Sequence, residues 1–113
     1  MSRQTGQQFE MLACQYLQRQ GLVLLAQNLN FRYGELDLVM QHADTLVIVE
    51  VKYRQSALYG SAAATVTGPK QQKLRLAAQG YLQQTRWQGA VRFDVVAISG
   101  EPPYQLDWFK HAF

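Results

Sequence analysis

The fold is decided by two neighbouring stretches, Gly34-Glu35-Leu36-Asp37-Leu38-Val39-Met40 and Leu46-Val47-Ile48-Val49-Glu50-Val51-Lys52. Both are rich in β-branched and aliphatic residues, and the polar segment 41–45 separates them, which predicts two strands of a hairpin. Three charged side chains lie inside these apolar stretches, Asp37 in the first and Glu50 and Lys52 in the second. Solvation alone does not favour charges at such positions, so the pattern indicates a site.

The register of this hairpin determines whether the three charges meet. Side chains alternate along a strand, so Glu50 and Lys52 share a face, with their Cα atoms about 7 Å apart. With a four-residue loop at 42–45, Gln41 pairs with Leu46 and Asp37 lies opposite Glu50. A register shifted by one residue would turn the two sets to opposite faces. We therefore expect Asp37, Glu50 and Lys52 to converge on one side of the sheet.

Two carboxylates held side by side repel each other, and a hard divalent cation such as Mg²⁺ or Mn²⁺ relieves the repulsion. A neighbouring lysine can hold an attacking water or stabilise charge on a phosphoryl group. The arrangement of Asp37, Glu50 and Lys52 is therefore typical of metal-dependent phosphodiester cleavage. The alternative is an ordinary strand face with a solvated Glu50–Lys52 ion pair, and spacing alone does not choose between the two.

Length and composition define the class of protein. The 113 residues, 48% hydrophobic and 17% charged, predict one globular domain spanning residues 1–113. No apolar run approaches the roughly 20 residues of a membrane span. The first residues lack a signal-peptide core, so we expect a cytoplasmic protein without a membrane partner. The single cysteine, Cys14, excludes an internal disulfide and is expected to pack in the core.

Positive charge is concentrated in one part of the chain. The net charge is only +3, but the interval between Glu50 and Asp94 contains no acidic residue. Such segregation predicts a positive surface for a polyanion, and the alternative is a solvated basic face without a partner. The basic residues of the interval are Lys52, Arg54, Lys70, Lys73, Arg75, Arg86 and Arg92.

Hydrophobic periodicity predicts the remaining elements. An amphipathic helix around residues 9–17 ends near Gly21, a strand runs from 22 to about 30, and 28–34 is a turn region. After the hairpin, residues 55–67 are expected to form a mobile loop beside the site. A second helix starts at Thr67-Gly68-Pro69, and strands follow at 91–98 and 104–109. The order α-β-β-β-α-β-β predicts an α/β fold in which helices flank a mixed sheet.

Two charged helix residues are candidates for the same site. Glu10 lies at the edge of the apolar stripe of the first helix, where a carboxylate can reach the sheet, although spacing alone favours an ordinary flanking acid. Lys70 continues the inward line of Leu74 and Ala77 and is predicted to point at the site. The alternative for Lys70 is a side chain that covers the edge of the core with its charge in water.

The strand at 91–98 contains a further acid. Arg92 and Asp94 share a face and are expected to pair with each other, and Asp94 is a minor candidate for an additional metal ligand. His42 and His111 have no neighbours at ligand spacing, so neither is predicted to be catalytic.

Several motifs together resemble the bacterial YraN family over essentially the whole chain. They are Gly6-x-x-x-Glu10, Gly34-Glu35-Leu36-Asp37-Leu38, Val49-Glu50-Val51-Lys52-Tyr53-Arg54, Lys70 and Arg92-Phe93-Asp94-Val95-Val96. That family is similar to Holliday-junction resolvases and restriction endonucleases of the PD-(D/E)xK fold. The resemblance implies a restriction-endonuclease-like domain in which Glu10, Asp37, Glu50 and Lys52 correspond to the nuclease motif, with Asp37 and Glu50 as metal ligands.

The sequence thus predicts a nuclease that uses Mg²⁺ or Mn²⁺ to cleave DNA, in preference to RNA, with branched or structured DNA as the expected substrate. Lys52 and Glu10 are the expected catalytic residues, while Arg54, Lys70 and Lys73 are expected to bind flanking phosphates. A homodimer is plausible because a duplex presents two strands. The alternative is a catalytically silent nucleic-acid-binding module on the same fold.

Overall fold

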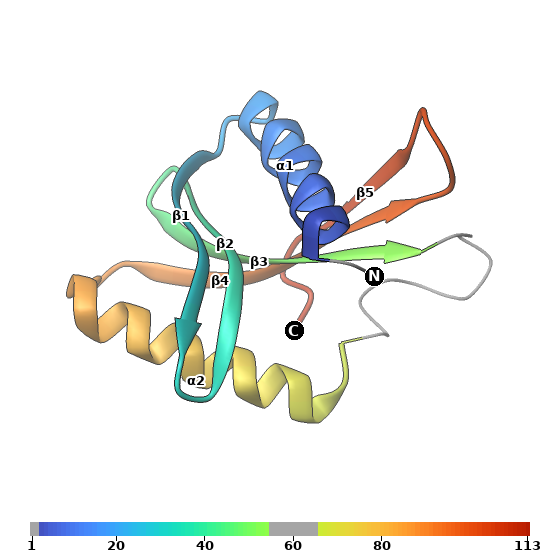
Figure 1. Ribbon diagram of the computed structural model, residues 1–113. Helices are drawn as coiled ribbons and strands as arrows, with labels where there is room; N and C mark the ends of the chain where they lie inside the picture. The colour runs from blue at the N-terminus through green and yellow to red at the C-terminus, as the bar shows by residue number, and fades with distance from the viewer. Residues whose placement is uncertain (1–2, 55–65) are drawn as a thin grey trace.

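Five strands and two helices make up the structure, a computed structural model that describes residues 3–54 and 66–113. Residues 55–65, which make up most of the expected mobile loop, are outside the described residues. The order α-β-β-β-α-β-β is confirmed (Figure 1). The elements are α1 (Arg3–Arg19), β1 (Val23–Phe31), β2 (Gly34–His42), β3 (Thr45–Arg54), α2 (Gly68–Thr85), β4 (Ala90–Ser99) and β5 (Gln105–Phe109).

The strands form one mixed sheet in the order β1-β2-β3-β4-β5. Neighbouring strands are antiparallel except β3 and β4, which are parallel. A parallel pair needs a crossover connection, and α2 lies in that connection. The predicted mixed sheet is therefore confirmed, with β3 at its centre.

The two helices cover opposite faces of this sheet (Figure 1). One core packs α2 residues such as Leu74 and Ala77 against Ile48 of β3. The other packs α1 residues such as Phe9 and Leu17 on the opposite face of the same strands. The near-continuous apolar sequence of β3 follows from this arrangement, because a strand buried on both faces has no polar side.

The start of α2 agrees with the predicted Thr67-Gly68-Pro69 signal. Thr67 is the N-cap, and its hydroxyl oxygen accepts a hydrogen bond from the Lys70 amide at 3.4 Å. Further along, a Cβ at Gly80 would lie 2.7 Å from the ring of Phe31, so only glycine lets the helix approach the end of β1 this closely. The helix is thereby fixed with its N-terminal turn near the carboxyl end of β3.

The turns differ in length from the predictions. Gln41 pairs with Leu46 as expected, but His42 also pairs with Thr45, so the hairpin loop has two residues instead of four. The predicted turn at 28–34 is wrong over its first half, because β1 continues to Phe31. Hairpin pairing of β1 with β2 overrides the turn propensity of the asparagines there.

No helix in the described ranges is long and apolar enough to cross a membrane.

A candidate metal and phosphate site

The candidate site lies where β2 and β3 separate. Their ladder ends with the pair Leu38–Val49, one pair before Asp37 and Glu50. Beyond that pair the Asp37 carboxylate crosses to β3 and accepts a hydrogen bond from the Val51 amide at 3.1 Å. The side chain of Asp37 thus takes the place of a backbone acceptor, which holds its carboxylate in the gap between the strands.

Glu50 is the centre of the charged cluster. Only 5% of the residue is exposed, although it carries a carboxylate. Its Oε1 atom lies 3.4 Å from Nζ of Lys52 and 3.7 Å from Nζ of Lys70. Its Oε2 atom is buried and has no hydrogen-bond partner within residues 3–54 and 66–113. A buried carboxylate oxygen without a partner is costly, so this atom is poised to accept a cation or a donor.

Asp37 responds strongly to this environment. Burial is the largest cause, and the charge of Glu50 adds to it, raising the pKa of Asp37 to about 8. The hydrogen bond from the Val51 amide opposes the rise, while the charge of Glu10 adds to it. Two carboxyl groups that cannot easily ionise together are the arrangement that a divalent cation relieves.

Glu10 reaches the same region from the other helix. Burial raises the pKa of its carboxyl group, as do the charges of Glu35 and Glu50, while a hydrogen bond with Asn28 lowers it. Its Oε1 atom is buried and has no hydrogen-bond partner in the part of the chain that the structure describes. Glu10 therefore interacts electrostatically with both strand carboxylates, and its role at the site stays a prediction.

The three residues expected to bind phosphate occupy different positions. Lys70 points into the site, as predicted, and its ion pair with Glu50 replaces the alternative of a side chain that only covers the core edge. Lys73 lies exposed on α2, one turn further on. Arg54 ends β3 and follows Glu50 and Lys52 at the two-residue spacing that places strand side chains on one face.

Part of the acid-free basic interval serves packing instead. The guanidinium of Arg75 lies 5.0 Å from the ring centre of Phe93 and 5.7 Å from that of Phe113. Arg92 pairs with Asp94 at 2.9 Å, as expected. Arg75 and Arg92 thus contact other protein groups, although Arg75 remains exposed at the surface.

Asp94 is not a candidate metal ligand. It is fully buried, and both of its oxygens are occupied. They accept hydrogen bonds from the Arg92 side chain at 2.9 and 3.0 Å, from the Trp108 indole at 2.9 Å and from the His111 amide at 3.1 Å. The same network includes His42, whose Nδ1 atom lies 3.3 Å from Arg92. Asp94 therefore joins β4 to β5 and the C-terminal turn.

The donor set at the site fits a hard divalent cation with two protein ligands. Within residues 3–54 and 66–113, no group of three or more His, Cys, Asp or Glu side chains is placed to hold a metal ion together. Asp37 and Glu50 would be the ligands. A bound ion would also give the Oε2 atom of Glu50 the partner that it lacks among the described residues. Mg²⁺ commonly binds through one or two carboxylates and takes its other oxygens from water and phosphate.

Sequence reasoning missed Asn28 as a member of this cluster. It lies in the middle of β1 with φ of 53°, a left-handed conformation that asparagine tolerates better than most residues. The pairs Gln27–Leu38 and Leu29–Leu36 flank it, so Asn28 stands across from Asp37. The polar pair Gln27-Asn28 within the strand was the available signal, but asparagine also suits a turn, which is how the sequence was interpreted.

Comparison with known proteins agrees with the sequence motifs. A model of the uncharacterised protein family UPF0102 matches residues 9–98. This range includes every residue of the candidate site, from Glu10 to Lys73. The chain belongs to the UPF0102 family. This confirms the resemblance to the YraN family. UPF0102 proteins of Yersinia pseudotuberculosis and Yersinia pestis are each 48% identical over 114 residues, covering 98% of this chain and 95% of the relative.

The raised pKa of Asp37 predicts how this UPF0102 protein responds to pH. Because the folded state holds the Asp37 proton more tightly than the unfolded chain does, that contribution to stability is complete below about pH 4 and is lost as the pH rises through about 8. In EDTA, Asp37→Asn should therefore be more stable than the wild type at pH 8 by up to about 5 kcal/mol, and the two should converge at low pH. Thermal unfolding at several pH values measures this difference.

The matched control is Asp44→Asn, which removes an exposed acid from the β2–β3 turn. It should follow the wild-type pH dependence. Equal Tm shifts for wild type and Asp37→Asn across the range from pH 5 to 8 would contradict the raised pKa of Asp37.

Proposed function

We propose that the protein is a divalent-metal-dependent nuclease that hydrolyses phosphodiester bonds in DNA, with branched or structured DNA as its substrate. The observation that carries the proposal is the setting of Glu50. This buried carboxylate has one oxygen facing two lysines at 3.4 and 3.7 Å and the other without a hydrogen-bond partner among the described residues, beside a second carboxyl group at Asp37. The resemblance of the sequence motifs to those of PD-(D/E)xK nucleases supports the same activity.

Each residue of the cluster has a role in this proposal. Asp37 and Glu50 would hold Mg²⁺ or Mn²⁺, which when bound would supply a positive charge that polarises the phosphate and lowers the pKa of water. Lys52 is 31% exposed at its side chain, so its ammonium group can turn from Glu50 to a substrate phosphate or to the attacking water. Glu10 would support the bound ion from α1, either directly or through water.

The flanking cations hold the substrate. Lys70 lies at the N-terminal turn of α2, where the helix dipole adds to its attraction for phosphate. Lys73 and Arg54 extend the positive surface on either side, so affinity should fall steeply with salt. In this proposal the protein acts in the cytoplasm as a homodimer. A duplex presents two strands, and two copies of the chain would provide one site for each strand.

A second candidate function is a catalytically silent nucleic-acid-binding module. One observation favours it: the ammonium groups of Lys52 and Lys70 neutralise the charge of Glu50 without a metal ion. In that case the lysines stabilise the buried carboxylate, and only the outer cations contact nucleic acid. The two functions differ in whether a metal ion displaces the lysines from Glu50.

Cleavage assays with Lys52→Ala test the proposal. Wild-type protein should cut branched DNA in Mg²⁺ or Mn²⁺, in preference to single-stranded DNA, duplex DNA and RNA, and should not cut in EDTA. Lys52→Ala should cut about 10²-fold more slowly, because it lacks the positive donor next to the developing phosphoryl charge. Gel assays with end-labelled substrates give both rates.

Lys110→Ala is the matched control, since Lys110 is an exposed lysine after β5 that lies over the Trp108 ring. It should cut at the wild-type rate. If wild type and Lys52→Ala both bind branched DNA and neither cuts it with either metal, the nuclease is excluded and the binding module is supported.

A further inference from the structure

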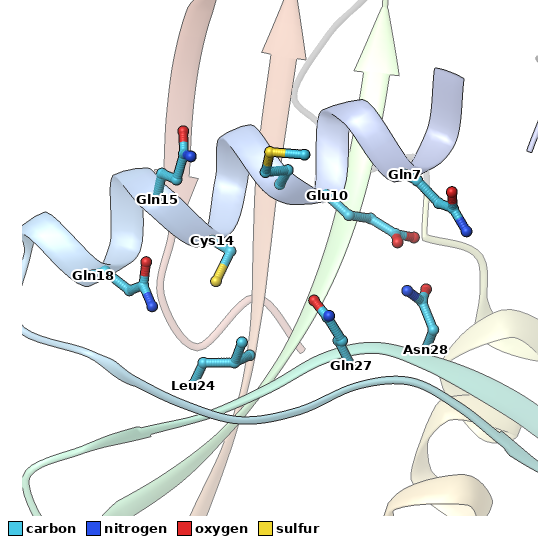
Figure 2. Close-up of a pocket in the computed structure, with 9 residues that line it drawn as sticks. Gln7, Glu10, Cys14, Gln15, Gln18, Leu24, Gln27 and Asn28 are labelled. Carbon is cyan, nitrogen blue, oxygen red and sulfur yellow. The ribbon is translucent and has the colours of Figure 1, made fainter. Parts of the chain in front are cut away.

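A groove of about 510 Å³ lies between α1 and β1, next to Glu10. Five of its nine lining residues are amides: Gln7, Gln15, Gln18, Gln27 and Asn28. In Figure 2, Gln27 and Asn28 rise from β1 toward the helix, and Glu10 points back toward them from α1. The groove thus joins the candidate site at Glu10, on the side away from Lys70.

The chemistry of the lining indicates what kind of ligand the groove takes. No lysine or arginine of the described residues lines it, so a phosphate has no counter-charge there. Amide side chains each offer donors and an acceptor, and Leu24, Met11 and Cys14 add apolar surface beneath them. A planar group with apolar faces and hydrogen-bonding edges matches this combination. Nucleobases have those properties, and glutamine and asparagine are residues that read base edges.

The backbone of β1 is distorted in a way that builds this groove. Side chains of consecutive strand residues normally point to opposite faces, yet Gln27 and Asn28 both line the groove. The left-handed conformation of Asn28, with φ of 53°, breaks the alternation, and a register shift between Leu24 and Ala26 precedes it. Such irregularities cost free energy and occur where a strand re-aims side chains next to a functional site.

The amides are also available for a ligand. Within the part of the chain that the structure describes, Gln15, Gln18 and Gln27 make no side-chain hydrogen bond to protein groups. Asn28 differs, because its hydrogen bond with Glu10 connects the groove to the carboxylates. A base held by Asn28 would therefore lie beside the phosphate that the site acts on.

We infer that this groove binds an unpaired nucleobase next to the phosphodiester bond that is cut. The inference rests on the proposed function and adds a substrate class to it, namely DNA with a base outside the duplex. Bases inside a duplex are stacked and paired, so they do not present a free edge and face together to one groove. Substrate structure is thus recognised by α1 and β1, while phosphate is held by β3 and α2.

Binding measurements in EDTA test the groove independently of cleavage. The probes are two hairpin DNAs with the same phosphates, one with a single unpaired adenosine and one with an abasic residue at that position. Wild-type protein should bind the first about tenfold more tightly, by fluorescence anisotropy. The double variant Gln27→Ala/Asn28→Gly should bind both DNAs with the affinity that wild type has for the abasic one, since glycine retains the left-handed conformation without the amide.

Two further variants keep the result interpretable. Gln15→Ala changes an exposed helix position to the best helix former, so it should fold normally and lose part of the tenfold preference. Gln79→Ala removes an exposed glutamine from α2, outside the groove, and should retain the preference in full.

Equal binding of both DNAs by the wild type would overturn the inference, as would an unchanged preference in the double variant. The outcome for the nuclease is separate. A protein that prefers the unpaired base and never cuts loses the proposed activity but retains the groove, whereas one that cuts both hairpins equally loses the groove alone.

Discussion

Replacing Glu50 by glutamine is expected to lower the rate of DNA cleavage by about 10³-fold or more. The amide has the same shape but carries no charge, so it is a poor ligand for Mg²⁺ and leaves Asp37 as the only strong protein ligand. The variant should also lose the rise in Tm that Mg²⁺ gives to the wild type, because a metal that binds only the folded state must stabilise it. Rates and Tm values in matched buffers measure both effects.

The fold should survive this substitution. Lys52 and Lys70 lose their partner, but their side chains are 31% and 41% exposed and can turn to water. Removal of a buried charge next to Asp37 also relieves repulsion. Glu101→Gln, at an exposed position between β4 and β5, is the matched control and should cut like the wild type. Wild-type cleavage and an unchanged Mg²⁺ effect in Glu50→Gln would exclude Glu50 as a ligand.

The hairpin that carries Glu50 was predictable because its register follows from hydrophobic alternation. Leu46 and Ile48 belong to the core under α2, while Val47 and Val49 belong to the core under α1. A shift by one residue would exchange these sets, so the sequence has one register that buries both faces. The position of Lys70 followed for a similar reason, since the stripe of Leu74 and Ala77 fixes which face of α2 meets the sheet.

Contacts that depend on where two distant elements meet were not predictable in the same way. Glu10 lies on a helix edge, and only the docking of α1 near Asn28 decides that it reaches the strand carboxylates. The left-handed backbone of Asn28 is imposed by pairing with β2 on both sides of it. Nor does a charge count reveal that Arg75 lies over the Phe93 ring. Periodicity describes one element at a time, and these contacts involve two or three.

Asp94→Ala is expected to destabilise the protein by about 3–5 kcal/mol, the cost of breaking a buried ion pair by removing one partner. Asp94 is fully buried, and the substitution leaves Arg92, whose side chain is only 15% exposed, without a counter-charge. The Trp108 indole and the His111 amide lose their acceptor as well. With typical stabilities of about 5–15 kcal/mol, the loss is a large fraction of the total. Urea unfolding at neutral pH measures it, with an unchanged m value as the sign that the same surface is exposed.

Asp107→Ala is the matched control, because Asp107 is a partly exposed acid on β5 whose side chain hydrogen-bonds only the exposed Gln105 among the described residues. Its effect should stay within about 0.5 kcal/mol. Asp94→Ala should also retain the Mg²⁺-dependent rise in Tm, measured at temperatures where it is folded, since its oxygens bind protein donors and not a cation. A variant with wild-type stability that had lost only the Mg²⁺ effect would reverse this assignment. Asp94 would then be a metal ligand, and the conclusion that it has a structural role outside the candidate site of β2 and β3 would be wrong.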